Sequence, residues 1–390
     1  MDRRYITADW IYPVTAERIY HGVLVLEAEK IVDITSRDQV DFDQLEFYKG
    51  ILIPGFVNTH CHLELSHLKG KIPTGTGLIE FIKSVVSLRE VPQDEIDSAI
   101  ETADAYMWSH GIQAVGDICN KPDSFPVKRR SKIKYYSFVE MFDFLQGHKT
   151  DELTRGYKEA YAQAPEPKSA VPHAPYSVSP GLFLQINQLN SDKAIVSIHN
   201  QELKAEEDLF SHGHGDFYDF YGGFGLSLDH FQKTGKSSIH YSMTHMDPRQ
   251  QTLFVHNTNT LQDEIEEAIR WNKNMYWATC ANANLYIENR LPDYFYFIDA
   301  GAVMTIGTDS LSSNWQLSVL EEMKTISKYQ SRIPFETLLQ WATINGAKAL
   351  GMSDQFGSLD VGKHPGILLL TFDPEIDELT DQHVEVRRLI

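Results

Sequence analysis

The stretch of sequence that decides the fold is Ile51-Leu-Ile-Pro-Gly-Phe-Val-Asn-Thr-His60-Cys-His62. An apolar run that ends in polar side chains is typical of a buried parallel strand whose carboxyl end opens on a site. Residues two apart on a strand point to the same side, so the His60 and His62 imidazoles can reach one metal ion. The sequence therefore predicts a strand over residues 51–58 with a metal site at its end.

Seven more runs rich in apolar and β-branched residues follow, and segments of helical period separate them. The expected strands cover residues 112–118, 133–139, 170–173, 194–199, 253–256, 275–279 and 302–307. Helices are expected over residues 78–88, 94–108, 180–190, 263–272, 317–329 and 334–350. Strands joined by helical crossovers in this number predict an α/β fold, the (β/α)8 TIM barrel, whose catalytic groups lie at the carboxyl ends of the strands.

The two ends of the chain have a different pattern. Residues 1–50 contain short β-type runs, such as residues 18–26, which turn or charged residues separate as in a small antiparallel unit. The tail, residues 357–390, returns to a β-like composition. We expect it to pair with the N-terminal strands.

The composition excludes several classes of protein. The 390 residues carry 35 basic and 54 acidic side chains, a formal net charge of −19, so neither a nucleic acid nor an anionic membrane is expected as a partner. No apolar run approaches the roughly 18 to 20 residues of a transmembrane helix. The N-terminus lacks the apolar core of a signal peptide. Three cysteines cannot staple a chain of this length, so a cytoplasmic location is expected.

Further titratable residues stand at the ends of predicted strands. His199 follows Ala-Ile-Val-Ser-Ile, His256 follows Leu-Phe-Val, and Asp309 follows Val-Met-Thr-Ile-Gly-Thr. The carboxyl ends of barrel strands share one mouth, so these side chains are expected to converge with the first histidine pair. Glu202 lies three residues beyond His199 and is expected to reach the same pocket.

A second His-x-His pair occurs, but its context differs. His212 and His214 lie in Ser-His-Gly-His-Gly, a glycine-rich stretch with no strand before it. We interpret them as solvated loop histidines.

Five motifs resemble the metal-dependent deaminase and chlorohydrolase branch of the amidohydrolase superfamily. In chain order they are Asn58-Thr-His-Cys-His, His199-Asn-Gln-Glu202, His256, Cys280-Ala-Asn-Ala-Asn-Leu and Gly307-Thr-Asp-Ser-Leu-Ser-Ser-Asn314. This branch includes adenosine-type, S-adenosylhomocysteine, aminodeoxyfutalosine and cytosine deaminases and the triazine chlorohydrolases. The resemblance implies a catalytic barrel of residues 51–356 and a small β-sandwich built from residues 1–50 and 357–390. It also favours a homodimer.

The resemblance implies a site with one divalent metal ion, held by His60, His62, His199 and Asp309. Imidazole nitrogens with a carboxylate suit zinc, with iron or manganese as alternatives. Water beside such an ion has a pKa of roughly 7, which makes hydroxide available near neutrality. Asp309 would take the water proton, and His256 would orient the hydroxide. Glu202 would protonate the ring nitrogen next to the attacked carbon.

The fourth strand region, Val171-Pro-His-Ala-Pro-Tyr-Ser, holds no lysine. Binuclear members of the superfamily carry a bridging carboxylated lysine there, so a single metal is favoured. His173 in this stretch is similar to a substrate-contacting histidine of the nucleoside-type deaminases.

Other residues are expected to contact the substrate. Glu80 lies where some nucleoside deaminases place a ribose-hydroxyl acceptor. Asn284 lies in Cys280-Ala-Asn-Ala-Asn, which departs from the family's Cys-Pro-x-Ser-Asn pattern. Trp315 and Tyr176 are candidates to stack on a planar heterocycle. Glu64 is expected either to orient His62 or to lie on the surface.

The expected reaction is hydrolytic deamination of a purine-like or other N-heterocyclic small molecule, with release of ammonia. Loss of another group, such as chloride, or deimination of a formimino substrate uses the same chemistry and stays open. A non-enzymatic scaffold is disfavoured because Asp309, Glu202 and His256 are all present.

Overall fold

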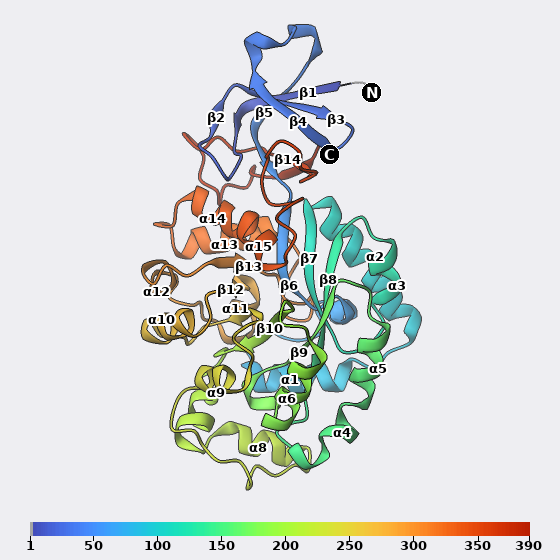
Figure 1. The fold of residues 1–390 in the computed structure, drawn as a ribbon, viewed down its shortest axis with the longest axis vertical. Helices are drawn as coiled ribbons and strands as arrows, with labels where there is room; N and C mark the ends of the chain where they lie inside the picture. Colours follow the sequence, from blue (N-terminus) through green and yellow to red (C-terminus); the bar gives the residue numbers. More distant parts are fainter. Residues whose placement is uncertain (1–2) are drawn as a thin grey trace.

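The computed structural model describes residues 3–390 (Figure 1). Within this range the strands form two four-stranded parallel sheets and one seven-stranded mixed sheet. In Figure 1 the mixed sheet lies at the top, at one end of the molecule, and the parallel strands and their helices lie below it. The α/β character predicted from the sequence is confirmed.

The parallel sheets contain the predicted strands in chain order. The first sheet has the order β6-β7-β8-β9, with bounds Phe56–Cys61, Ile112–Cys119, Lys134–Met141 and Lys168–Pro172. The second has the order β10-β11-β12-β13, with bounds Ile195–Asn200, Gln251–His256, Met275–Thr279 and Met304–Ile306. Their residues are nearly all buried, as expected for parallel strands that helices cover.

The predicted strand over residues 51–58 is instead two strands. Strand β5 (Leu45–Pro54) belongs to the mixed sheet, and β6 begins at Phe56. Gly55 separates them at a point where a Cβ atom would lie 2.2 Å from Gln113 Cγ and 2.7 Å from Pro365 O. Only glycine allows so close an approach, and the chain passes here from one sheet to the next.

Backbone hydrogen bonds connect the two parallel sheets at both edges. Between β9 and β10, His199 N donates to His173 O at 2.9 Å. Between β13 and β6, Thr308 N and Asp309 N both donate to His60 O at 3.0 Å. The carboxyl ends of the first and last parallel strands therefore lie side by side.

Both chain ends join the mixed sheet, whose order is β15-β14-β5-β1-β3-β4 with β2 paired to β1. Its other strands are β1 (Arg3–Ile11), β2 (Ile19–Tyr20), β3 (Gly22–Glu27), β4 (Lys30–Ser36), β14 (Ile367–Leu370) and β15 (Val386–Arg388). The predicted pairing of the tail with the N-terminal strands is confirmed, because β14 runs antiparallel to β5. Ile6, Leu24, Leu52 and Ile367 belong to a separate small core of this sheet.

Helices connect the parallel strands. They are α1 (Leu78–Leu88), α2 (Gln93–Ser109), α3 (Phe125–Arg130), α4 (Thr150–Leu153), α5 (Arg155–Gln163), α6 (Pro180–Leu189), α7 (Lys204–Glu207), α8 (Asp216–Gly223), α9 (Ser238–His245), α10 (Gln262–Trp271), α11 (Ala281–Glu288), α12 (Tyr294–Asp299), α13 (Val319–Tyr329), α14 (Phe335–Ala342) and α15 (Ile344–Ala349). Of the helices in residues 3–390, none has the length and apolar character needed to cross a bilayer.

The single helix predicted over residues 334–350 is broken into α14 and α15. Thr343 between them has φ −134° and ψ −92°, which no helix accommodates. The break lets α15 pack closely on β6, where a Cβ on Gly346 would lie 3.0 Å from Val57 Cβ. Tertiary packing therefore overrides the helical period at this point.

A buried ion pair supports the chain just after β6. Lys128 Nζ lies 2.5 Å from Asp117 Oδ2, and both side chains are fully buried. Asp117 Oδ1 accepts a hydrogen bond from Leu63 N at 2.8 Å. Burial raises the pKa of Asp117, and the charge of Lys128 opposes this effect. The pair thus fixes the backbone next to His62.

We expect Lys128→Met to destabilise the protein by about 3–5 kcal/mol, because it leaves the Asp117 carboxylate buried without a counter-charge. Urea unfolding followed by fluorescence measures the change. The double variant Asp117→Asn/Lys128→Met is the control and should recover part of the loss, since no uncompensated charge remains. A loss below about 1 kcal/mol in the single variant would show that this pair does not support the fold.

Candidate metal centre

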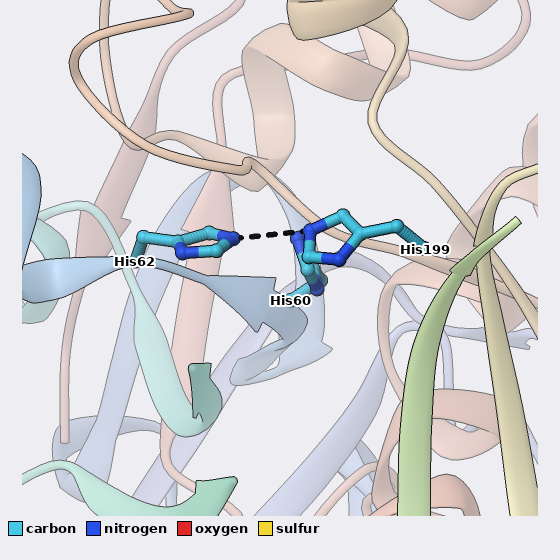
Figure 2. A group of neighbouring side chains, drawn as sticks. All are labelled: His60, His62 and His199. Atoms are coloured by element: carbon cyan, nitrogen blue, oxygen red, sulfur yellow. Dashed lines mark hydrogen bonds between the residues drawn. The ribbon is translucent and has the colours of Figure 1, made fainter. Parts of the chain in front are cut away.

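Imidazoles from distant strands converge at the carboxyl ends of the parallel sheets (Figure 2). His62 Nε2 and His199 Nε2 lie 3.3 Å apart. Asp309 Oδ1 lies 3.7 Å from His60 Nε2 and 3.5 Å from His62 Nε2. The structure therefore brings together the four residues that the sequence predicts as metal ligands.

The donor atoms fit a divalent cation. Ligands of a tetrahedral site with metal–nitrogen bonds of about 2.0–2.1 Å stand about 3.3 Å apart, which matches the two imidazoles of His62 and His199. Both ring nitrogens of His60 are buried and have no hydrogen-bond partner in the described part of the chain. Buried polar atoms without partners are rare, and a bound cation would satisfy Nε2, the ring nitrogen that faces Asp309.

Burial sets the protonation of these groups. It lowers the pKa of His60, lowers that of His62 to about 3, and lowers that of His199 well below its usual value. Burial works against ionisation of Asp309, but the surrounding histidines outweigh it and hold the pKa of that carboxyl well below its usual value. The site therefore offers neutral imidazoles and a carboxylate, the forms that bind a metal.

Backbone strain and hydrogen bonds aim the ligands. Asp309 has a φ of +54°, unusual for a residue with a side chain and common at functional sites. Its Oδ2 accepts a hydrogen bond from Ser313 Oγ at 2.6 Å, while Oδ1 faces the imidazoles. His199 Nδ1 donates to His173 O at 2.8 Å, which leaves Nε2 free to bind a metal.

Two further groups adjoin the ligands. His256 Nε2 lies 3.7 Å from Glu202 Oε1, and both side chains are buried. Burial raises the pKa of Glu202 well above its usual value and so favours the protonated form of this carboxyl. His256 Nδ1 donates to Asn284 Oδ1 at 2.8 Å. The structure thus places Asn284 behind His256 and not at the cavity wall where the sequence suggested a substrate contact.

The loop that carries Glu202 is held by a residue that sequence reasoning missed. Glu202 N donates to Glu206 Oε1 at 2.8 Å, and Ser238 Oγ donates to Glu206 Oε2 at 2.9 Å. Burial raises the pKa of Glu206 to about 8. No sequence signal separates Glu206 from its half-buried neighbour Glu207.

These residues open on a cavity of about 320 Å³. His62, His173, His199, Glu202, His256 and Asp309 contribute to its lining. Apolar side chains of α1 and α8, including Phe81, Val85 and Phe220, form much of the remaining wall. His173 Nδ1 pairs with Ser177 Oγ at 2.7 Å, and Tyr176 also lines the cavity. The cavity therefore joins a polar reacting end to an apolar outer part.

Other predicted contacts are not brought to the cavity. The Glu80 side chain is 61% exposed, because it points away from the face of α1 that carries Phe81. It forms an ion pair with Lys83. Trp315 is 49% exposed and packs against Tyr286, with ring centroids 5.3 Å apart. His212 and His214 are exposed, which agrees with their interpretation as solvated histidines.

The cavity also contains polar residues that the sequence analysis missed or misplaced. Glu64 is buried, so it is not a surface group, and its partners are Arg89 and the backbone after β7. Arg89, Asn120 and Glu140 line the same wall. Glu140 ends the apolar run of β8, so the strand-end rule that found His199 could have found it too.

Comparisons with known proteins agree with this geometry. A model of the amidohydrolase family matches residues 51–386. An adenosine deaminase of Helicobacter pylori is 26% identical over 360 residues, which cover 88% of this chain and 86% of the relative. The crystal structure of Helicobacter pylori aminofutalosine deaminase with methylthio-coformycin superposes with a TM-score of 0.81 at 23% identity, covering 99% of this chain and 100% of that one. A zinc-bound adenosine deaminase from Xanthomonas campestris gives a TM-score of 0.74 at 19% identity, with 98% and 89% covered.

The fold and the site together define a metal-dependent hydrolase. The chain belongs to the amidohydrolase family. The resemblance found in the sequence is confirmed, and so is the prediction of a hydrolase that acts on carbon–nitrogen bonds.

We expect His62→Ala to lose the metal, because it removes one of the four converging donors. Elemental analysis of the purified protein should find about one divalent ion per wild-type chain and a small fraction of that in the variant. His212→Ala, in the exposed pair, is the matched control and should keep the wild-type content. Equal metal content in all three proteins would contradict the ligand assignment.

Proposed function

We propose that this chain deaminates a 6-aminopurine nucleoside or a closely similar N-heterocycle and releases ammonia. The observation that carries the proposal is the meeting of a single set of metal donors with His256 and the buried carboxyl of Glu202 at the end of one cavity. The relatives support it, because one is an adenosine deaminase and another is an aminofutalosine deaminase that binds methylthio-coformycin.

His60, His62, His199 and Asp309 would hold the ion, which we propose to be zinc. Imidazole nitrogens and a carboxylate suit zinc, and the Xanthomonas campestris relative contains it. When bound, a divalent cation lowers the pKa of water to about 7 and so supplies hydroxide near neutrality.

The chain's own residues then move the protons. Asp309 accepts the proton of the attacking water, and His256, held through Nδ1 by Asn284, orients that water with Nε2. Glu202 gives its proton to the ring nitrogen next to the attacked carbon. The proton taken by Asp309 passes to the exocyclic nitrogen, so that the bond from this carbon to that nitrogen breaks and ammonia leaves. The remaining proton of the added oxygen returns to Glu202, and an oxo product remains.

The same proposal includes the complete architecture. The two parallel sheets close into a (β/α)8 barrel that begins at Phe56 and not at residue 51, because residues 51–54 belong to β5 of the mixed sheet. The backbone hydrogen bonds at both edges support this closure. Residues 3–54 and 357–390 form the β-sandwich domain, which the seven-stranded mixed sheet supports.

We expect zinc-loaded protein to release ammonia from one class of substrate in a panel of adenosine, 5′-modified adenosines, aminodeoxyfutalosine, guanine, cytosine, pterins and formimino compounds. A coupled assay measures the ammonia. Asp309→Asn is the blank and should lose at least about 10²-fold in kcat, because nothing takes the water proton. Chloride from a chlorinated triazine with no ammonia from any compound would select the chlorohydrolase alternative instead.

We expect Glu202→Gln to lower kcat by about 10²- to 10⁴-fold while the metal content stays at the wild-type level. An amide of the same shape cannot donate the proton that the ring nitrogen needs. Steady-state kinetics and elemental analysis of the same preparations give the two numbers. A kcat within about threefold of the wild type would remove Glu202 from the proton transfer.

A further inference from the structure

One polar strip, made of Glu64, Arg89, Asn120 and Glu140, interrupts the apolar wall of the cavity. We propose that Arg89, Asn120 and Glu140 in this strip bind a vicinal diol, the two ribose hydroxyls of a nucleoside. The identity of the ligand as a nucleoside rests on the proposed function.

Glu64 is the part of the strip that is already satisfied. Its Oε1 pairs with Arg89 Nη2 at 3.3 Å, and its Oε2 accepts hydrogen bonds from Asn120 N and Lys121 N at 3.1 Å each. Glu64 therefore holds Arg89 and the loop after β7 in place. It has little capacity left for a ligand.

Glu140 is the unsatisfied part. Its side chain is 4% exposed, and its Oε1 has no hydrogen-bond partner among residues 3–390. His199 Nδ1 lies 3.6 Å away, but its proton goes to His173 O at 2.8 Å. The contact of Glu140 Oε2 with Asn120 Nδ2 is long, at 3.5 Å. A buried acceptor in this state is costly unless a ligand or water pairs with it.

Arg89 supplies donors next to this acceptor. A guanidinium carries five N–H donors. In the described part of the chain only Arg89 Nη2 makes hydrogen bonds, to Glu64 and to Asn120 Oδ1 at 3.2 Å. The Nε and Nη1 groups remain available beside the cavity.

The chemistry of the strip selects hydroxyl groups. A hydroxyl can donate to Glu140 Oε1 and at the same time accept from Arg89 or Asn120. An anionic group would meet two carboxyl groups and only one guanidinium. An apolar group would leave Glu140 unpaired. A vicinal diol satisfies both sides of the strip, and Glu80, the ribose acceptor that the sequence suggested, lies on the surface.

The test measures binding without turnover. Isothermal titration of the metal-loaded protein compares the affinities of inosine and 2′,3′-dideoxyinosine. We expect the wild type to prefer inosine about tenfold or more, the ratio that the hydrogen bonds of two hydroxyl groups together provide. Glu140→Leu should reduce the preference to within about threefold while the affinity for dideoxyinosine changes less than about twofold. Glu140→Gln, which keeps an acceptor, should retain part of the preference. Glu101→Gln, on the exposed face of α2, should keep the wild-type ratio.

Three results would overturn the proposal. In the first, the wild type does not bind inosine. In the second, the wild type binds inosine and dideoxyinosine with equal affinity. In the third, Glu140→Leu loses the metal and weakens the binding of both ligands by the same factor. The last result would mean that Glu140 positions His199. Should Glu140→Leu fail to fold, Asn120→Ala replaces it with the same expected direction. Ammonia assays run separately. Absence of ammonia with an intact preference for inosine would reject the reaction and keep the diol subsite.

Discussion

The structure depends on one backbone contact, in which Thr308 N and Asp309 N both donate hydrogen bonds to His60 O. This contact joins the first and last parallel strands and sets His60 beside Asp309, although strands β7 to β13 and helices α1 to α12 lie between these two residues in the chain. Gly307 permits the approach, because a Cβ there would lie 2.8 Å from His60 Cβ. Register at this edge therefore determines whether the metal donors meet at all.

The same packing that joins the strands removes water from the donors, and this decides their chemistry. Burial favours neutral imidazoles and the protonated form of Glu202, so one physical cause prepares both a set of metal ligands and a proton donor. Burying the site leaves some polar atoms without hydrogen-bond partners, such as those of His60 and Glu140, which is unfavourable. Most other buried polar groups of the described residues are paired.

The reacting end of the site could be predicted from the sequence because its information is local. Apolar runs mark the strands, and a polar residue at the end of a run marks the mouth, which located His60, His199 and Asp309. The outer wall could not be predicted, because it depends on how helices rotate against the sheet. Glu80 and Phe81 are neighbours in α1, yet the former is exposed and the latter lines the cavity. The sequence predicts the period of the helix but not how the helix is rotated about its axis relative to the sheet.

The reacting end of the site and its outer wall therefore have different roles: the former carries the chemistry and the latter the selectivity for substrate. The donors sit on strand ends fixed by backbone hydrogen bonds, where a small displacement would break the convergence at Asp309. The wall that meets the rest of the ligand comes from α1, α8 and the loop after β7, where side chains can change without moving a strand. Glu64 illustrates the coupling that remains. It offsets the charge of Arg89 and leaves its donors in place, so the polar strip favours neutral hydroxyl groups over an anion. The partner that a buried charged side chain already has in the protein determines which ligand groups it can still bind. That partner can be identified only from the folded structure.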